Sequence, residues 1–110
     1  MTETDIQHSI QIALSDYGIV LRLNVGEFTT KDGRHISSGL PVGTSDLLFI
    51  GHGYIAFIEV KRPKGHIRPE QITFINAMRK LGHRAGIAHS VDEALNIINY
   101  AGDPAEMGEN

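Results

Sequence analysis

Two apolar runs joined by a glycine-rich turn constrain what this chain can fold into. Residues 45–50 and 54–61 are rich in β-branched and aromatic side chains, and Gly51, His52 and Gly53 separate them. Runs of this kind with a two-residue turn at His52-Gly53 predict an antiparallel β-hairpin. The turn sets the register, and the expected pairs are Ile50 with Ile55, Leu48 with Phe57 and Asp46 with Glu59.

The predicted hairpin carries charges where a core strand should have none. Because side chains alternate between the two faces of a strand, Glu59 and Lys61 point to the same face as Asp46. Opposed like charges destabilise a strand pair, and buried charges are normally paired or bound to a metal. One interpretation is a structural ion pair of Lys61 with Glu59 or Asp46. The other is a divalent-metal site, in which the carboxylates bind Mg²⁺ and the lysine orients the attacking water.

The motif and its surroundings resemble a known nuclease superfamily. Asp46 followed by Glu59-Val60-Lys61 is similar to the core motif of the PD-(D/E)XK nucleases. The wider context resembles the VRR-NUC branch of that superfamily, particularly its small stand-alone, phage-type members, over residues 3–98. The residues that carry this likeness are Gly43-Thr44-Ser45-Asp46-Leu47, Ile58-Glu59-Val60-Lys61, Gly65, Glu70-Gln71 and Gly82.

The resemblance implies a fold, a cofactor and an activity. The fold is a restriction-endonuclease-like α/β domain in the order αβββαβα, with a central mixed β-sheet flanked by helices. The activity is Mg²⁺- or Mn²⁺-dependent hydrolysis of DNA phosphodiesters, with no small-molecule cofactor. Asp46, Glu59 and the Val60 carbonyl would bind the metal, and Lys61 would position the water. Stand-alone members of the family imply a homodimer that cuts branched DNA, in particular four-way (Holliday) junctions.

Two further residues enter the expected site by the same resemblance. Gln71 lies at the N-terminal end of an apolar helical stripe that follows Pro69, and it would orient water or substrate. Alternatively, the Gln71 side chain forms a hydrogen bond with a nearby backbone group and has no role in the site. Glu3 matches a first-helix glutamate that supports the metal site in the family. An acid in the first turn is also what the helix dipole favours, so both interpretations of Glu3 stay open.

The charge distribution is compatible with a DNA partner although the net charge is −3. All ten Lys and Arg lie between Arg22 and Arg84 together with five acids, so this middle region is net +5, whereas the flanks hold eight acids and no base. Two groups of side chains are expected to contact the DNA backbone. Lys31 and Arg34 lie in a loop or loose hairpin over residues 30–42. The second group follows the predicted strand that ends at Lys61 and consists of Arg62, Lys64, His66 and Arg68. For Lys31 and Arg34, a solvated loop is the alternative.

Length and composition predict one domain over residues 1–100, which the resemblance implies is a VRR-NUC-like nuclease domain, and an acidic, disordered tail over residues 101–110. Helices are expected over residues 3–16, from Pro69 to Gly82, and from Ser90 to Tyr100, with further strands over residues 19–29 and 84–89.

No apolar run is long enough to cross a membrane or to act as a signal peptide, and there is no cysteine to form a disulfide. An intracellular, cytoplasmic protein is therefore expected, and the resemblance adds a phage or prophage origin. Two alternatives to a DNA nuclease stay open, namely a non-catalytic nucleic-acid-binding module and a ribonuclease. Side-by-side digestion of DNA and RNA would separate the two nuclease activities.

Overall fold

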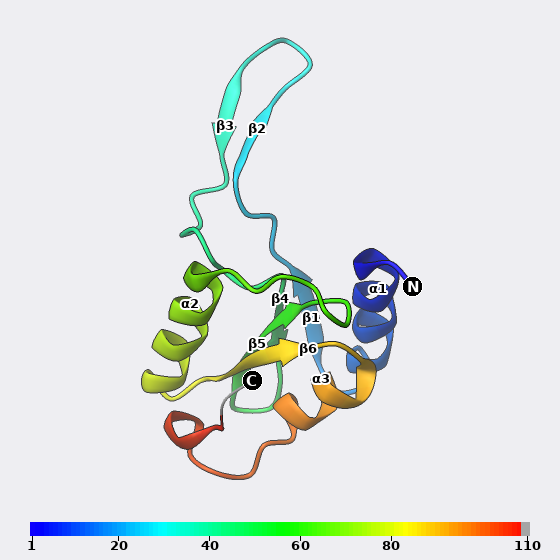
Figure 1. Cartoon of the computed structure of the whole chain (residues 1–110), viewed down its shortest axis with the longest axis vertical. Coiled ribbons are helices and arrows are strands. Elements are labelled where there is room, and N and C mark those ends of the chain that lie inside the picture. Colours follow the sequence, from blue (N-terminus) through cyan, green and yellow to red (C-terminus); the bar gives the residue numbers. More distant parts are fainter. Residues whose placement is uncertain (109–110) are drawn as a thin grey trace.

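The computed structural model describes residues 1–108, and of residues 27 and 28 it describes only the backbone. None of the helices in this described part is long and apolar enough to pass through a membrane. In chain order, the elements are α1 (Glu3–Leu14), β1 (Ile19–Arg22), β2 (Glu27–Thr29), β3 (His35–Ser37), β4 (Leu47–Ile50), β5 (Ile55–Val60), α2 (Pro69–Lys80), β6 (Arg84–Ala88), α3 (Val91–Ile98) and the short 3₁₀-helix η1 (Pro104–Glu106) (Figure 1).

Four strands form the central sheet, in the order β1-β4-β5-β6. β4 is antiparallel to both β1 and β5, whereas β5 and β6 run parallel because α2 connects them as a crossover. This arrangement confirms the predicted α/β class with a mixed sheet flanked by helices. When β2 and β3, which lie outside this sheet, are set aside, the elements up to α3 follow the predicted order αβββαβα.

The β4–β5 hairpin has the predicted register. At its turn, the Gly51 N–H donates to the Tyr54 carbonyl over 2.9 Å. Gly53 has a φ of 81°, a left-handed conformation that glycine adopts without steric cost. Continuing the same register by one residue beyond β4 places Asp46 opposite Glu59. The observed pairs include Ile50 with Ile55 and Leu48 with Phe57.

Helices cover the two faces of the sheet unequally. α1 and α3 lie on one face and enclose the larger core, whereas α2 lies on the other face against β5 and β6 (Figure 1). The larger core includes Leu14, Phe49, Ile58 and Ile98. The smaller core, beneath α2, is formed by Ile75, Ala85 and Ile87. β5 is therefore packed on both faces, which holds its last residues in a fixed position relative to α2.

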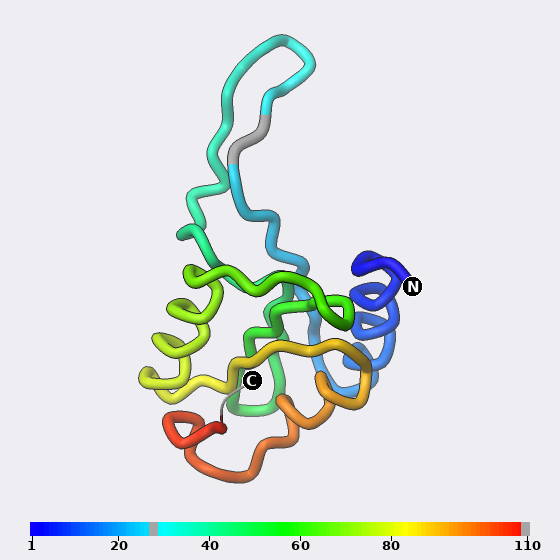
Figure 2. Tube along the Cα trace, in the orientation of Figure 1, coloured from blue at the N-terminus to red at the C-terminus, as the bar shows by residue number. Residues whose placement is uncertain are grey.

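β2 and β3 form a two-stranded arm that projects from one end of the sheet (Figure 2). The prediction of one continuous strand over residues 19–29 was wrong, because β1 ends at Arg22. The Leu23 N–H still donates to the Asp46 carbonyl, but Gly26 then adopts a φ of 120° and the chain leaves the sheet. Residues 30–42, expected to be a loop or loose hairpin, form the tip of the arm and its returning strand.

The C-terminal segment packs against the domain, whereas the sequence predicted disorder over residues 101–110. Met107 packs against the larger core just after η1. Arg79, a buried residue of α2, donates from Nη1 to the Gly108 carbonyl over 3.0 Å. These contacts order the segment as far as residue 108, and residues 109 and 110 of the predicted tail lie outside the described residues.

Gly43→Ala tests how tightly the segment before β4 packs against α2. Gly43 has a φ of 93°, and a Cβ atom added there would lie 2.3 Å from the Glu70 carbonyl oxygen. Backbone strain and the clash together should cost roughly 2–4 kcal/mol, which corresponds to a fall in melting temperature of about 8 °C or more. Thermal unfolding followed by circular dichroism measures this shift.

Gly39→Ala is the matched control. Gly39 also has a positive φ, 75°, but no atom lies within 4 Å of the added Cβ. This variant should carry the backbone strain of a positive φ without the clash, so its melting temperature should fall by clearly less. Equal shifts in the two variants would contradict the tight packing at Gly43.

Candidate active site

Three charged side chains meet at the edge of the sheet where β4 begins and β5 ends. Glu59 and Lys61 are buried, with 2% and 8% of their surfaces exposed, and Asp46 is half-buried. The Lys61 Nζ lies 4.0 Å from the Glu59 Oε2. The hairpin register therefore brings together the three residues that the sequence placed on one face.

A backbone hydrogen bond fixes the orientation of Asp46. The Val60 N–H donates to Asp46 Oδ2 over 2.8 Å, so the carboxylate lies along the end of β5 with the Val60 peptide beside it. The segment that leads to Asp46 packs closely against the start of α2, where Gly43 lies next to the Glu70 backbone. Asp46 is thus positioned from both β5 and α2.

Gln71 connects the start of α2 to the buried carboxyl. Its Nε2 donates to Glu59 Oε2 over 3.1 Å, and its Oε1 accepts from the Arg68 N–H over 2.9 Å. The side chain is 4% exposed. The sequence left two interpretations of Gln71 open, and the hydrogen bonds include both kinds of partner, a backbone amide and a site carboxyl.

The environment of Glu59 strongly disfavours its ionised form. Burial, and after it the negative charge of Asp46, raises the pKa of Glu59 from 4.5 to about 9, although Lys61 acts in the opposite direction. Lys61 at 4.0 Å therefore does not compensate for burying the two carboxyls side by side. A structural ion pair alone does not account for this arrangement.

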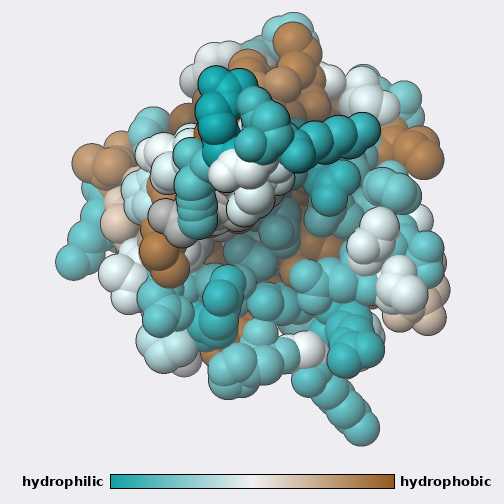
Figure 3. Space-filling view, turned by 90° about the horizontal axis from the view of Figure 1, so that it is seen from above, coloured by the Kyte–Doolittle hydropathy of each residue, from teal (hydrophilic) through white to brown (hydrophobic). Residues whose placement is uncertain are grey.

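Asp46, Glu59 and Gln71 line a cavity of about 280 Å³ at the base of the arm. Both ends of the arm contribute to its wall, the outgoing segment through residues 22–25 and the returning segment through Gly43, Thr44 and Asp46. Seen from above, the molecular surface around this end is mostly hydrophilic, with hydrophobic residues in separate areas towards the edges (Figure 3). The cavity is large enough for a phosphate group and several waters.

Several residues of this cavity were not among the predicted site residues. Arg22 ends β1, Asn24 follows that strand, and Gln7 lies on α1. They reach the cavity through the three-dimensional arrangement of α1, β1 and the arm, which no local pattern encodes. The added lining residues are Gln7, Arg22, Leu23, Asn24, Val25, Gly43 and Thr44.

Glu3 lies in the first turn of α1, one turn before Gln7, and is half-buried. Its charge makes a small contribution to the raised pKa of Glu59, behind burial, Asp46 and Lys61. The capping box of α1 is formed by Thr2 and Asp5 and does not use the Glu3 side chain. Glu3 is thus within electrostatic range of Glu59, and its role in the site stays a prediction.

The segment between β5 and α2 presents four basic or potentially basic side chains to solvent. A tight turn, in which the Gly65 N–H donates to the Arg62 carbonyl over 2.8 Å, shapes it. Arg68 also lines the cavity. The structure therefore places this predicted DNA-binding group beside the site; its exposed members are Arg62, Lys64, His66 and Arg68.

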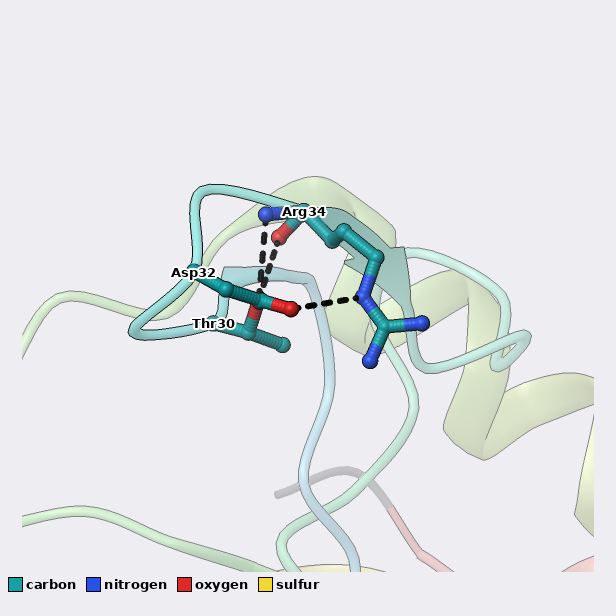
Figure 4. Close-up of polar contacts among 3 residues, drawn as sticks. All are labelled: Thr30, Asp32 and Arg34. Carbon is teal, nitrogen blue, oxygen red and sulfur yellow. Dashed lines mark hydrogen bonds and ion pairs between the residues drawn. The ribbon is translucent and has the colours of Figure 1, made fainter.

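Lys31 and Arg34 are carried instead on the tip of the arm, away from the cavity (Figures 1 and 4). Arg34 Nε lies 3.3 Å from Asp32 Oδ2, and the Arg34 N–H donates to Thr30 Oγ1 over 3.0 Å. Thr30 also donates from Oγ1 to Asp32. The tip is a compact polar turn that does not join the other predicted site residues.

A family model confirms what the motif predicted. The model of the VRR-NUC domain matches residues 1–92. The chain belongs to the VRR-NUC family. A solved structure described as a VRR_NUC domain is 24% identical, covers 93% of this chain and 100% of its own, and superposes with a TM-score of 0.63, which supports the fold. None of the curated proteins matches the chain. Membership identifies a nuclease-type domain and implies hydrolase chemistry with DNA as the substrate.

The residues of this VRR-NUC domain fit a hard divalent cation. Glu59 Oε1 is buried and has no hydrogen-bond partner in the described chain. A buried carboxyl oxygen of this kind needs either a proton or a cation, and carboxylate oxygens are the ligands that Mg²⁺ and Mn²⁺ prefer. Residues 1–108 contain no group of three or more His, Cys, Asp and Glu that could hold a metal ion. Asp46 and Glu59 are therefore a pair, and a cation there needs further oxygen ligands.

In metal-free protein, we expect the raised pKa of Glu59 to make folding stability depend on pH. Since the pKa is raised in the folded state, its contribution is fully present below pH 4.5 and is lost as the pH rises through about 9. Glu59→Gln mimics the protonated form, so this variant should lose less stability between pH 5 and 9. Each pKa unit is worth about 1.4 kcal/mol, so the variant should melt about 5 °C or more above the wild type at pH 9.

Thermal unfolding in chelator across this pH range provides the measurement. Glu70→Gln, at an exposed position in the first turn of α2, is the matched control and should follow the wild-type curve. Parallel curves for the wild type and Glu59→Gln would contradict the raised pKa.

Proposed function

We propose that this VRR-NUC domain is a metal-dependent endonuclease that hydrolyses DNA phosphodiesters and prefers branched DNA. The observation that carries the proposal is the pair formed by the buried Glu59 and the half-buried Asp46, whose mutual repulsion Lys61 does not balance. A divalent cation bound by both carboxylates would offset this repulsion, and the two residues would then serve as its ligands.

Asp46, Glu59 and the Val60 carbonyl would hold Mg²⁺ or Mn²⁺, which when bound polarises the phosphate and lowers the pKa of a coordinated water. The chain supplies the remaining functions. Lys61 is fixed beside Glu59 by burial, and its ammonium group would orient the attacking water and offset charge in the transition state. Gln71, held at both ends of its amide, would keep Glu59 in place and orient water or substrate.

The basic side chains around the cavity would position the DNA backbone. Arg22 and Arg68 line the cavity itself, where they can contact the scissile phosphate or its neighbour. Arg62, Lys64 and His66 would bind the adjacent phosphates along the segment that leaves β5. Contacts of this kind give sequence-independent affinity, so this domain would bind DNA by its backbone and shape rather than by its bases.

Recognition of branched DNA and action as a homodimer form the finer part of the proposal. A domain of this size offers little surface for reading base sequence. Two identical subunits related by a two-fold axis would present two such cavities, which suits paired cuts in a four-way junction. Lys31 and Arg34, on the projecting arm, would then contact the DNA backbone at a distance from the cut.

Cleavage of a labelled four-way junction tests the activity, the metal and the substrate together. We expect paired cuts in Mg²⁺ or Mn²⁺, none in chelator, and weaker cutting of linear duplex and of single strands. Lys61→Ala should lower the rate by about 10²–10⁴-fold, because it removes the group that orients the water. The control is Lys80→Ala, at an exposed position in the last turn of α2, which should retain the wild-type rate.

The outcomes separate the parts of the proposal. Equal cutting of every DNA would contradict the preference for branched DNA but would still support the nuclease activity. Faster cutting of RNA than DNA would make the domain a ribonuclease. Binding of DNA without any metal-dependent cutting would contradict the nuclease and favour a binding module.

A further inference from the structure

A second cavity, of about 690 Å³, lies at the opposite end of the sheet from the candidate active site. The active site lies where β4 begins and β5 ends, whereas this cavity lies where β4 ends and β5 begins. Its wall is formed by the β4–β5 turn, by the turn between α2 and β6, and by the segment after α3 (Figure 1). We call it the turn cavity.

The turn cavity and the active site also lie on opposite faces of the sheet. Arg84, which lines the turn cavity, is paired with Ala56, and Ala56 belongs to the larger core beneath α1 and α3. Phe57, which shares its face of β5 with Glu59, packs against the smaller core beneath α2. Ile55 and Glu59, which belong to the two cavities, are separated by roughly 13 Å along β5.

The guanidinium group of Arg84 is held in a fixed orientation in the turn cavity. Its central carbon lies 3.7 Å from the centroid of the Tyr54 ring, which is a cation–π contact. Its Nε donates to the Tyr100 carbonyl over 3.2 Å. The Tyr54 ring in turn packs on Gly51, where an added Cβ atom would lie 2.6 Å from ring carbons. One face and one edge of the guanidinium are therefore occupied.

The remaining edge of this guanidinium lacks an acceptor. Nη1 is buried and has no hydrogen-bond partner in the described part of the chain. Among the side chains that the structure describes, no carboxylate forms an ion pair with Arg84. Asp103, close to the turn cavity in sequence, accepts instead from the Ala105 N–H over 3.0 Å. Since buried guanidinium nitrogens normally have acceptors, the Nη1–Nη2 edge suits two oxygens of a carboxylate or a phosphate.

A second donor next to Arg84 favours a phosphate over a carboxylate. His83 is half-buried and lines the same cavity. The guanidinium edge alone can pair with both oxygens of a carboxylate. A phosphate monoester has three terminal oxygens and a charge between −1.5 and −2 at neutral pH, so it can also accept from the imidazole.

The rest of the wall suits an uncharged organic group attached to the phosphate. Ile50, Ile55 and Pro104 are apolar, and the other lining residues apart from Tyr54, His83 and Arg84 are glycines. A volume of about 690 Å³ lies within the range of small-molecule sites, which is roughly 300–1,000 Å³. A ligand of this size contains a phosphate and a ring system together.

We propose that the turn cavity binds a free nucleotide, with its phosphate on Arg84 and His83 and its sugar and base against the apolar wall. The basic segment proposed to bind DNA, residues 62–68, lies beside the active site at the other end of the sheet. A DNA strand held there is directed away from the turn cavity, which favours a free nucleotide over a strand. The inference goes beyond the proposed nuclease and does not depend on it.

A titration of the full-length protein with thymidine 5′-monophosphate, followed by amide NMR spectra in chelator, tests the inference. We expect saturable shifts at the glycines of the turn cavity and a dissociation constant of about 1 mM or below. Thymidine, inorganic phosphate and benzoate should each bind about 10-fold more weakly or worse, because each lacks part of the expected contacts. The reporting amides are those of Gly51, Gly53, Gly82 and Gly102.

Two variants test the contacts with the phosphate. Arg84→Lys keeps the charge but loses the paired donors, and it should weaken binding by about 10-fold or more. His83→Ala leaves the contacts of Arg84 with Tyr54 and Tyr100 in place and should weaken binding by about 5-fold. The matched control is Arg68→Lys, in the active-site cavity, which should leave nucleotide affinity unchanged. The amide spectrum of each variant shows whether it is folded.

Three results would overturn the inference. The first is the absence of saturable shifts at the four glycines. The second is a loss of affinity in Arg68→Lys that equals the loss in Arg84→Lys, which would place the nucleotide in the active site. The third is binding of inorganic phosphate or benzoate as tight as that of the nucleotide. DNA cleavage is measured separately, so a nuclease without nucleotide binding would contradict this inference alone, and nucleotide binding without cleavage would contradict only the proposed function.

Discussion

The buried carboxyl of Glu59 is the constraint on which the site depends. It lies beside Asp46 at the end of β5, and burial together with that neighbouring charge raises its pKa to about 9. A stable fold alone would gain from an apolar residue here, since an unbalanced buried carboxyl lowers stability as it ionises. The arrangement is understandable if the folded chain must hold a cation at this point.

The fold concentrates its rigid elements around this carboxyl. β5 is covered on both faces, its backbone holds Asp46, and the start of α2 holds Glu59 through Gln71. Both ends of the arm form part of the cavity wall, so the arm has a defined position relative to the site.

Local patterns in the sequence predicted the hairpin and the meeting of its charges. The turn at His52-Gly53 and the two-residue period of a strand were sufficient to place Asp46 opposite Glu59. The outgoing strand of the arm, β2, was not predicted as a separate element, because residues 19–29 alternate like one strand and the break depends on the backbone conformation at Gly26. Alternation alone cannot show where a chain leaves its sheet.

Contacts between residues far apart in the chain account for the other differences. The order of the C-terminal segment depends on Arg79 bonding to Gly108, 29 residues away. Arg22 and Gln7 reach the cavity only because β1 and α1 pack next to β4 and β5. The catalytic, metal-binding and DNA-binding roles of the predicted residues stay predictions.

The most direct test of the central claim is a Mn²⁺ titration of the DNA-free protein, followed by loss of the electron paramagnetic resonance signal of the free ion. The account predicts saturable binding at the carboxylate pair that is lost in both Asp46→Asn and Glu59→Gln. Saturable binding that survives in both variants, or the absence of any saturable binding by the wild type, would contradict a metal site at Asp46 and Glu59.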